Sequence, residues 1–253
     1  MEREKTVLNH TFYDLDSLLL RLSPRKDSSV PLQESTQKWE TLTMPERVSF
    51  QLDEANVLLL DKAEGSLDGV RWFSNTEILR LDNMLRNCIG LPERGGKVSQ
   101  PWADTETDQH HKVYLRFRVW AEQEVPGVKI ALEQRNTALV TLNGVEAGPV
   151  EGWYTDKAIL VRSLGDLRAG LNEINITMNI SRRKGLEWCY LLGKFGVKVA
   201  GEFRSLTQMP ELLGFDNVVS QGLPTMVAIS LIEFRCLAPG GYGLQYHIMQ
   251  ALR

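Results

Sequence analysis

The amino-acid sequence predicts an all-β sandwich that carries one inserted α-helix at about residues 75–90. Apolar and polar residues alternate in most hydrophobic segments of the 253-residue chain, a pattern typical of antiparallel sheets with one solvated face. One segment, 74–92, instead has its apolar residues at helical spacing, and strand-like segments lie on both sides of it. One helix among many strands leaves the class all-β.

The alternation predicts a series of strands along the chain. In 112–120 it places four apolar residues on one face, and in 172–180 it does the same. The inward residues are Val113, Leu115, Phe117 and Val119 in the first strand, and Ile174, Ile176, Met178 and Ile180 in the second. Further strands are predicted at 47–54, 128–134 and 194–203. Another is predicted in the segment 56–69, which begins with a buried run and ends in a turn at Asp68-Gly69.

A hairpin is predicted after the strand 138–142. Asn143-Gly144 follows this strand, and the pair favours a type I′ turn because both central positions need positive φ.

The helix is expected to begin at a capping box and to end at a glycine. Ser74 is the predicted N-cap, with Glu77 three residues on. Gly90 and Pro92 supply the stop signal. The predicted buried face consists of Ile78, Leu81, Leu85 and Ile89, and the helix is expected to lie as a lid on the sandwich.

The chain is divided by its composition into three parts. Residues 1–46 are interpreted as a strand (16–23) and a Ser- and Pro-rich linker (24–38), the remnant of a preceding β-domain. Residues 47–224 form the sandwich, and residues 225–253 form a divergent C-terminal tail.

Composition excludes several classes of partner. The net charge of −3 disfavours a nucleic-acid surface, and no run approaches the ~18 apolar residues of a membrane span. The N-terminus "MEREKTVLNH" lacks the apolar core of a secretory signal, so a cytoplasmic location is expected. Three widely spaced cysteines, Cys88, Cys189 and Cys236, support neither a disulfide framework nor a metal site. No cofactor motif is present.

Acidic residues are the first candidates for chemistry. Glycoside hydrolysis needs two carboxylates about 5–10 Å apart, and Asp61, Glu64 and Glu187 are the acids considered. The alternative is that Asp61 and Glu64 cap loops and that Glu187 pairs with Arg182 or Arg183. His110-His111, downstream of three acids, matches no zinc spacing and is interpreted as part of a solvated loop.

Aromatic residues give the stronger functional signal, because sugar rings stack on Trp and Tyr. The predicted saccharide-binding residues are Trp153, Tyr154, Glu187, Trp188 and Tyr190. The alternative is that these aromatics belong to the core. The outward face of 112–120, with Tyr114, Arg116, Arg118 and Trp120, is either a concave binding face or an interface with a partner domain.

The stretch "ALVTLNGVEAG", with "GWYTDKAILVRSLGDLRAGLNEINITMNI" downstream, resembles the galactose-binding-like, jelly-roll accessory domain of glycoside hydrolase family 2 and its relatives. Gly170, Asn172, Ile174 and Ile176 match the "G-x-N-x-I/L-x-I" strand of these domains. Two stretches, 56–96 and 186–199, resemble the C-terminal β-region of large microbial glycoside hydrolases. The similarity covers about residues 50–224.

Two departures qualify this resemblance. The chain has no βαβ alternation and no room for a barrel of about 250 residues, and the sequence after "QGLP" (221–224) is unlike the family.

Three functional hypotheses follow. The resemblance implies a non-catalytic carbohydrate-binding or accessory domain, including a fragment of a truncated hydrolase, with a saccharide or a glycoside hydrolase catalytic domain as partner. The alternatives are a small glycan-active hydrolase that uses its own carboxylates and a structural or protein-interaction sandwich without a ligand.

Overall fold

The computed structural model describes residues 11, 46–52, 54–94, 109–133, 138–225, 230–233 and 245–248. The chain divides into two compact units, Met1–Thr43 and Met44–Arg253, and every element below belongs to the second. The strand predicted at 16–23 and the linker at 24–38 lie outside the described residues.

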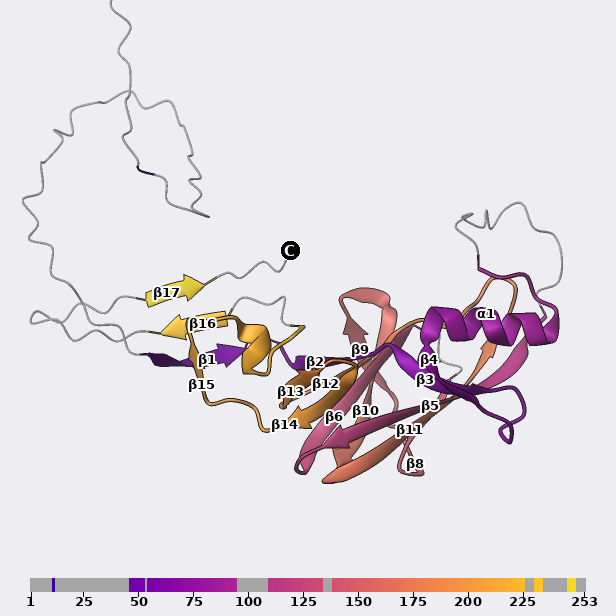
Figure 1. Cartoon of the computed structure of the whole chain (residues 1–253), viewed down its shortest axis with the longest axis horizontal. Helices are drawn as coiled ribbons and strands as arrows, with labels where there is room; N and C mark the ends of the chain where they lie inside the picture. Colours follow the sequence, from indigo (N-terminus) through magenta and orange to yellow (C-terminus); the bar gives the residue numbers. More distant parts are fainter. Residues whose placement is uncertain are drawn as a thin grey trace, which may run out of the picture. The chain divides into compact units, whose positions relative to one another are not determined.

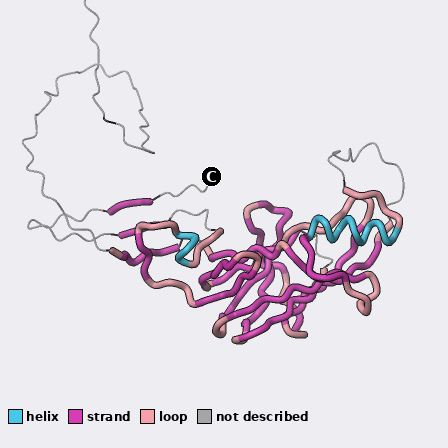
Figure 2. The backbone as a smooth tube through the Cα atoms, in the orientation of Figure 1, coloured by secondary structure: helices cyan, strands magenta, loops and turns pink. Residues whose placement is uncertain are grey.

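Two β-sheets form the main body of the second unit (Figures 1 and 2). The smaller sheet has five antiparallel strands, in the order β2 (Asn56–Leu60), β12 (Cys189–Gly193), β6 (Val125–Glu133), β10 (Asp156–Leu167) and β9 (Val150–Tyr154).

The larger sheet has eight strands. Its main path runs β13 (Gly196–Ala200), β14 (Phe203–Thr207), β5 (His111–Ala121), β11 (Gly170–Ile180), β7 (Leu139–Leu142) and β8 (Val145–Glu146). Strand β3 (Lys62–Ser66) pairs with β5, and β4 (Phe73–Glu77) pairs with β3. The pairing of β14 with β5 is parallel, whereas the other pairings in this sheet are antiparallel.

A single apolar core lies between these sheets, because one cluster of buried side chains draws members from both. Every second residue of β5 and β11 is buried, as the sequence pattern predicts, while the residues between them face outward. The buried rows are Val113, Leu115, Phe117 and Val119 in β5, and Ile174, Ile176, Met178 and Ile180 in β11. The prediction of an all-β sandwich with one helix is thereby confirmed.

The β7–β8 hairpin turns at Asn143-Gly144, as predicted. Asn143 has φ 50° and Gly144 has φ 87°, and a turn with positive φ at both central residues matches the right-handed twist of the strands that it joins.

The α-helix α1 (Ile78–Ile89) begins later than predicted. Ser74 is not the N-cap, because residues 73–77 form β4 and pair with β3. Glu77 is the N-cap instead, and its carboxylate accepts from the backbone N–H of Arg80 at 3.1 Å. The predicted end is confirmed, since Gly90 adopts φ 75° as a left-handed C-cap.

Helix α1 packs on the sandwich through the predicted face. Ile78, Leu81 and Leu85 are fully buried in the main core, and Ile89 packs against it. Figure 1 shows α1 beside β3 and β4, the strands that it contacts. The expected lid on the sandwich is therefore present.

Residues 194–203 do not form the single strand that was predicted. They contain β13, a turn at Gly201-Glu202, and the first residue of β14. Gly201 has φ 61°, which suits a tight reversal and ends the first strand.

A third sheet of four antiparallel strands includes part of the C-terminal segment. Its order is β15 (Leu212–Gly214), β1 (Arg47–Leu52), β16 (Ser230–Glu233) and β17 (Gln245–Ile248). Leu213 and Leu223 are buried together beside β1, near the short 3₁₀ helix η1 (Val218–Gln221). The two described strands of the segment 225–253 therefore extend the sheet of β1, since β16 pairs with β1 and β17 pairs with β16.

A buried ion pair within α1 is hydrogen-bonded to the loop before β12. Arg86 donates through Nε to Asp82 Oδ2 at 2.8 Å, and both side chains are almost completely buried. The other Asp82 oxygen accepts from the N–H of Leu186 at 3.1 Å, and Arg86 also donates to the carbonyl of Lys184 at 2.9 Å. Each buried charge therefore has a partner.

Asp82→Ala is expected to lower the free energy of unfolding by about 3–5 kcal/mol, because it leaves the charge of Arg86 buried and uncompensated. Urea denaturation measures the loss. Glu151→Ala is the matched control, since it breaks the half-exposed Lys129–Glu151 pair, and we expect it to cost at most about 1 kcal/mol. Equal losses in the two variants would contradict the structural role of Asp82.

Candidate functional site: a cleft at the edge of strand β5

One edge of β5 is shared by two different strands. Strand β11 pairs with β5 from His111 to Ala121 and so occupies the other edge completely. On the shared edge, β3 pairs with residues 114–116 and β14 with residues 120–121. Residues 117–119 lie between these ladders, and none of the described strands pairs with them on this edge, so the described sheet has a gap there.

The chain crosses between the two sheets at this gap. Asp61 joins β2 of the smaller sheet to β3 of the larger one. Arg204 of β14 donates to both carboxylate oxygens of Asp61 at 2.9 and 3.0 Å, and to the carbonyl of Leu59 at 2.9 Å. This bidentate contact links β14 to the crossing and forms one wall of a cleft.

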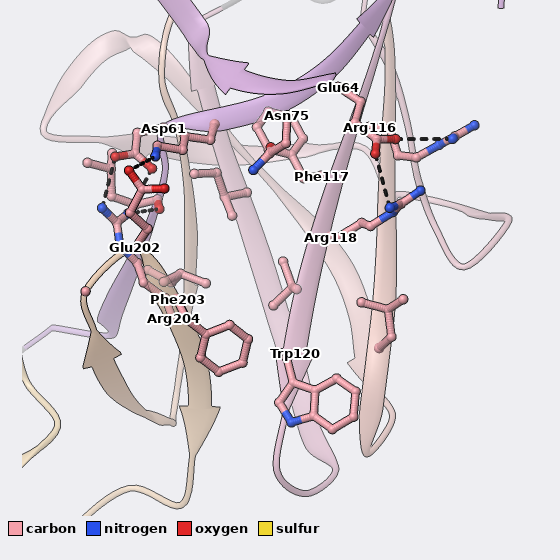
Figure 3. A pocket seen from close by; sticks show the side chains of 17 residues that line it. Asp61, Glu64, Asn75, Arg116, Phe117, Arg118, Trp120, Glu202, Phe203 and Arg204 are labelled. Carbon is pink, nitrogen blue, oxygen red and sulfur yellow. Dashed lines mark hydrogen bonds and ion pairs between the residues drawn. The ribbon is translucent and has the colours of Figure 1, made fainter. Parts of the chain in front are cut away.

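A second group of charges forms the opposite wall. Glu64 of β3 accepts from Arg116 at 3.3 Å and lies 3.1 Å from Nη1 of Arg118. Arg116 Nε also lies 3.4 Å from a carboxylate oxygen of Glu173, and its guanidinium stacks 3.9 Å above the ring of Trp72. Figure 3 shows the Asp61–Arg204 group and the Glu64 group on opposite sides of the cleft.

Aromatic rings form the end of the cleft that is away from these charges. Trp120 of β5 is 44 % exposed and Phe203 of β14 is 58 % exposed. In Figure 3 both rings lie below the charged groups. The exposed side chain of Leu171 on β11 also lines the cleft, so the site combines an apolar end with a polar one.

The cleft has a volume of about 570 Å³, which is in the usual range for small-molecule sites. A wider hollow of about 780 Å³ lies beside β13 and η1, but none of the described side chains that line it is aromatic. The cleft at β5 is therefore the better candidate for a ligand that stacks on rings.

Of the five saccharide-binding residues predicted from the sequence, the two tyrosines are in contact in the structure. Tyr154 and Tyr190 are in contact, with ring centroids 5.3 Å apart at an interplanar angle of 52°. Both rings pack against a small cluster on the outer face of the five-stranded sheet that includes Ala131 and Val161. Burial raises the pKa of both phenols, the nearby Glu54 adding to the effect at Tyr154 and the neighbouring Cys189 at Tyr190.

The other three predicted residues are placed differently. Trp153 on β9 is 57 % exposed. Glu187 forms an ion pair with Arg94, and Trp188 donates from its indole N–H to Glu77 at 3.0 Å. Desolvation opposes the charge on Glu77, but the bonds from Trp188 and the first amides of α1 outweigh it and keep the pKa of Glu77 below its ordinary value.

The acids and histidines considered from the sequence have no free catalytic arrangement in the described structure. Asp61, Glu64 and Glu187 are each paired with arginine. His111 begins β5, and the acids upstream of it lie outside the described residues. No group of three or more His, Cys, Asp or Glu side chains in the described part of the chain is placed to hold a metal ion.

The sequence pattern identified one wall of the cleft but not the other. The outward residues Arg116, Arg118 and Trp120 follow from the alternation in β5. Phe203 and Arg204 were missed because 194–203 was interpreted as one strand. The turn signal at Gly201, between two short alternating runs, indicates the second strand.

No protein-family model, curated protein or solved structure matches the chain. Among the helices that the structure describes, none is long and apolar enough to cross a membrane.

The two cysteines that the structure describes are expected to differ sharply in reactivity. Burial, with a smaller effect from Glu187, raises the pKa of the Cys189 thiol to about 12, whereas Cys88 is exposed on α1. Because the thiolate is the reactive form, iodoacetamide at pH 8 should label Cys88 in the native protein and spare Cys189 until urea is added. Peptide mapping by mass spectrometry measures this, and equal labelling rates at the two sites would show that Cys189 is accessible.

Proposed function

We propose that this sandwich is a non-catalytic carbohydrate-binding accessory domain and that the cleft at β5 is its saccharide site. The observation that carries the proposal is the presence, in one cleft, of two exposed rings beside planar guanidinium and carboxylate groups. The C–H faces of a sugar stack on rings such as Trp120 and Phe203. Its hydroxyls need planar, directional partners such as Arg118 and Glu64.

The arrangement of the acids supports binding rather than hydrolysis. A glycosidase needs one carboxyl group to protonate the leaving oxygen and a second to act as base or nucleophile. In the cleft, Asp61 is held through both oxygens by Arg204, and Glu64 is shared by Arg116 and Arg118. These carboxylates have the structural task of keeping the walls of the cleft in place.

The resemblance to accessory domains of glycoside hydrolases supports the same function and suggests the partner. Such a domain accompanies a catalytic domain, and we propose that this chain, or a longer protein that contains it, acts beside a glycoside hydrolase. A protein-interaction role is the second candidate, favoured by the exposed Leu171 next to Trp120 and Phe203.

Trp120→Ala is expected to abolish saccharide binding while leaving the melting temperature nearly unchanged. Removing one stacking ring costs about 1–3 kcal/mol, by analogy with bases that stack on aromatic residues, and millimolar binding is itself worth only about 4 kcal/mol. Calorimetric titration against a glycan panel and thermal melts measure the two effects.

Trp153→Ala is the matched control, because Trp153 is similarly exposed but lies on β9, outside the cleft. Binding that survives Trp120→Ala and disappears with Trp153→Ala would overturn the cleft as the site and favour the aromatic cluster predicted from the sequence. An absence of binding to every glycan tested would favour the protein-interaction role.

The purified chain is expected not to hydrolyse glycosides, because its candidate acids are held by arginines. Aryl-glycosides and polysaccharides should give no turnover above a buffer blank. Turnover that is lost in Asp61→Asn or Glu187→Gln would contradict the non-catalytic assignment and support a hydrolase that uses its own carboxylates.

A further inference from the structure

The cations of the cleft are almost matched by carboxylates, on a chain that is acidic overall. The lining of the cleft contains four cationic side chains and three carboxylates, whereas the chain has a net charge of −3. The cations are Lys62, Arg116, Arg118 and Arg204, and the acids are Asp61, Glu64 and Glu202. Glu173, 3.4 Å from Arg116, compensates the fourth cation, so the preference for a ligand depends on which cation keeps donors to offer.

Arg118 is the most exposed of the three arginines of the cleft. Arg204 uses two nitrogens on Asp61 and Leu59, and Arg116 is placed between two glutamates and the Trp72 ring. The side chain of Arg118 is 51 % exposed, and its Nη1 lies 3.1 Å from Glu64. A guanidinium carries five N–H donors in a fixed fork. Within the described part of the chain nothing else contacts Nε or Nη2 of Arg118, so these two nitrogens can form a bidentate contact with a carboxylate.

Arg118 and the stacking ring extend from the same face of β5. Arg118 and Trp120 are two residues apart on β5 and face the same outer side, so their Cβ atoms are separated by roughly 6.6 Å. In a uronic acid the carboxylate is attached directly to the pyranose ring. A ring stacked on Trp120 therefore brings its carboxylate within reach of the long side chain of Arg118.

We infer that the cleft binds acidic saccharides, with a uronate carboxylate on Arg118 and the sugar ring on Trp120. This inference rests on the proposed carbohydrate-binding function. The carboxylates of the cleft do not repel such a ligand strongly, because Asp61 and Glu64 are compensated by arginines and Glu202, at the rim, is paired with Lys62 at 3.0 Å.

The test is calorimetric titration of the full chain with oligomers of galacturonate, glucuronate and mannuronate, each beside its methyl ester. The ester keeps the ring and removes the charge. We expect at least one acid to bind at least 10-fold more tightly than its ester. We expect Arg118→Ala to weaken binding of the acid at least 10-fold more than binding of the ester, and so to remove that preference. Arg118→Lys should recover only part of it, since an ammonium cannot form the fork.

Arg71→Ala is the matched charge control, because Arg71 is an exposed arginine outside the cleft lining, paired with Asp68. An equal loss in Arg71→Ala and Arg118→Ala would show a general charge effect and overturn the inference. Equal affinity for all acids and their esters would overturn it and leave the proposed function standing. No binding of any saccharide, acidic or neutral, would overturn both.

Discussion

The rest of the structure depends on how the two edges of β5 are used. One edge is paired along its whole length with β11, whereas the other is divided between β3 and β14. Of the strands that the structure describes, none pairs with residues 117–119 on that edge, at the place where the chain passes from one sheet to the other through Asp61. A gap in a sheet exposes backbone groups that need partners. Here the gap is bordered by side chains that bring charge and aromatic rings to one place.

Arginine is suited to closing such a gap. Its planar fork can bind a carboxylate and a carbonyl at the same time, as Arg204 does with Asp61 and Leu59. On the opposite wall, Glu64 is held between two guanidinium groups. Both walls therefore have their charges compensated by the protein itself. Such a cleft needs little rearrangement to accept a ligand, and this lowers the free-energy cost of binding.

The features that sequence analysis predicted correctly depend on local patterns. Alternation identified β5 and β11, Asn143-Gly144 identified the hairpin, and Gly90 identified the end of α1. The helix start was wrong because Ser74 lies in a segment whose backbone pairs with β3. That long-range pairing overrides a local capping pattern. The cleft was found only in part, because Phe203 and Arg204 reach it through the parallel pairing of β14 with β5. No local pattern encodes a pairing between segments so far apart in the chain.

The two aromatic regions of the protein differ in what supports their rings. Tyr154 and Tyr190 cover Ala131 and Val161, which are buried on the outer face of the smaller sheet. Moving those rings to meet a ligand would expose apolar surface and cost free energy. Trp120 instead extends from a strand whose opposite face is anchored in the main core, and much of its own surface is already free. A ring in that position can accept a sugar without uncovering anything beneath it, and for this physical reason the cleft suits a ligand better than the tyrosine pair does.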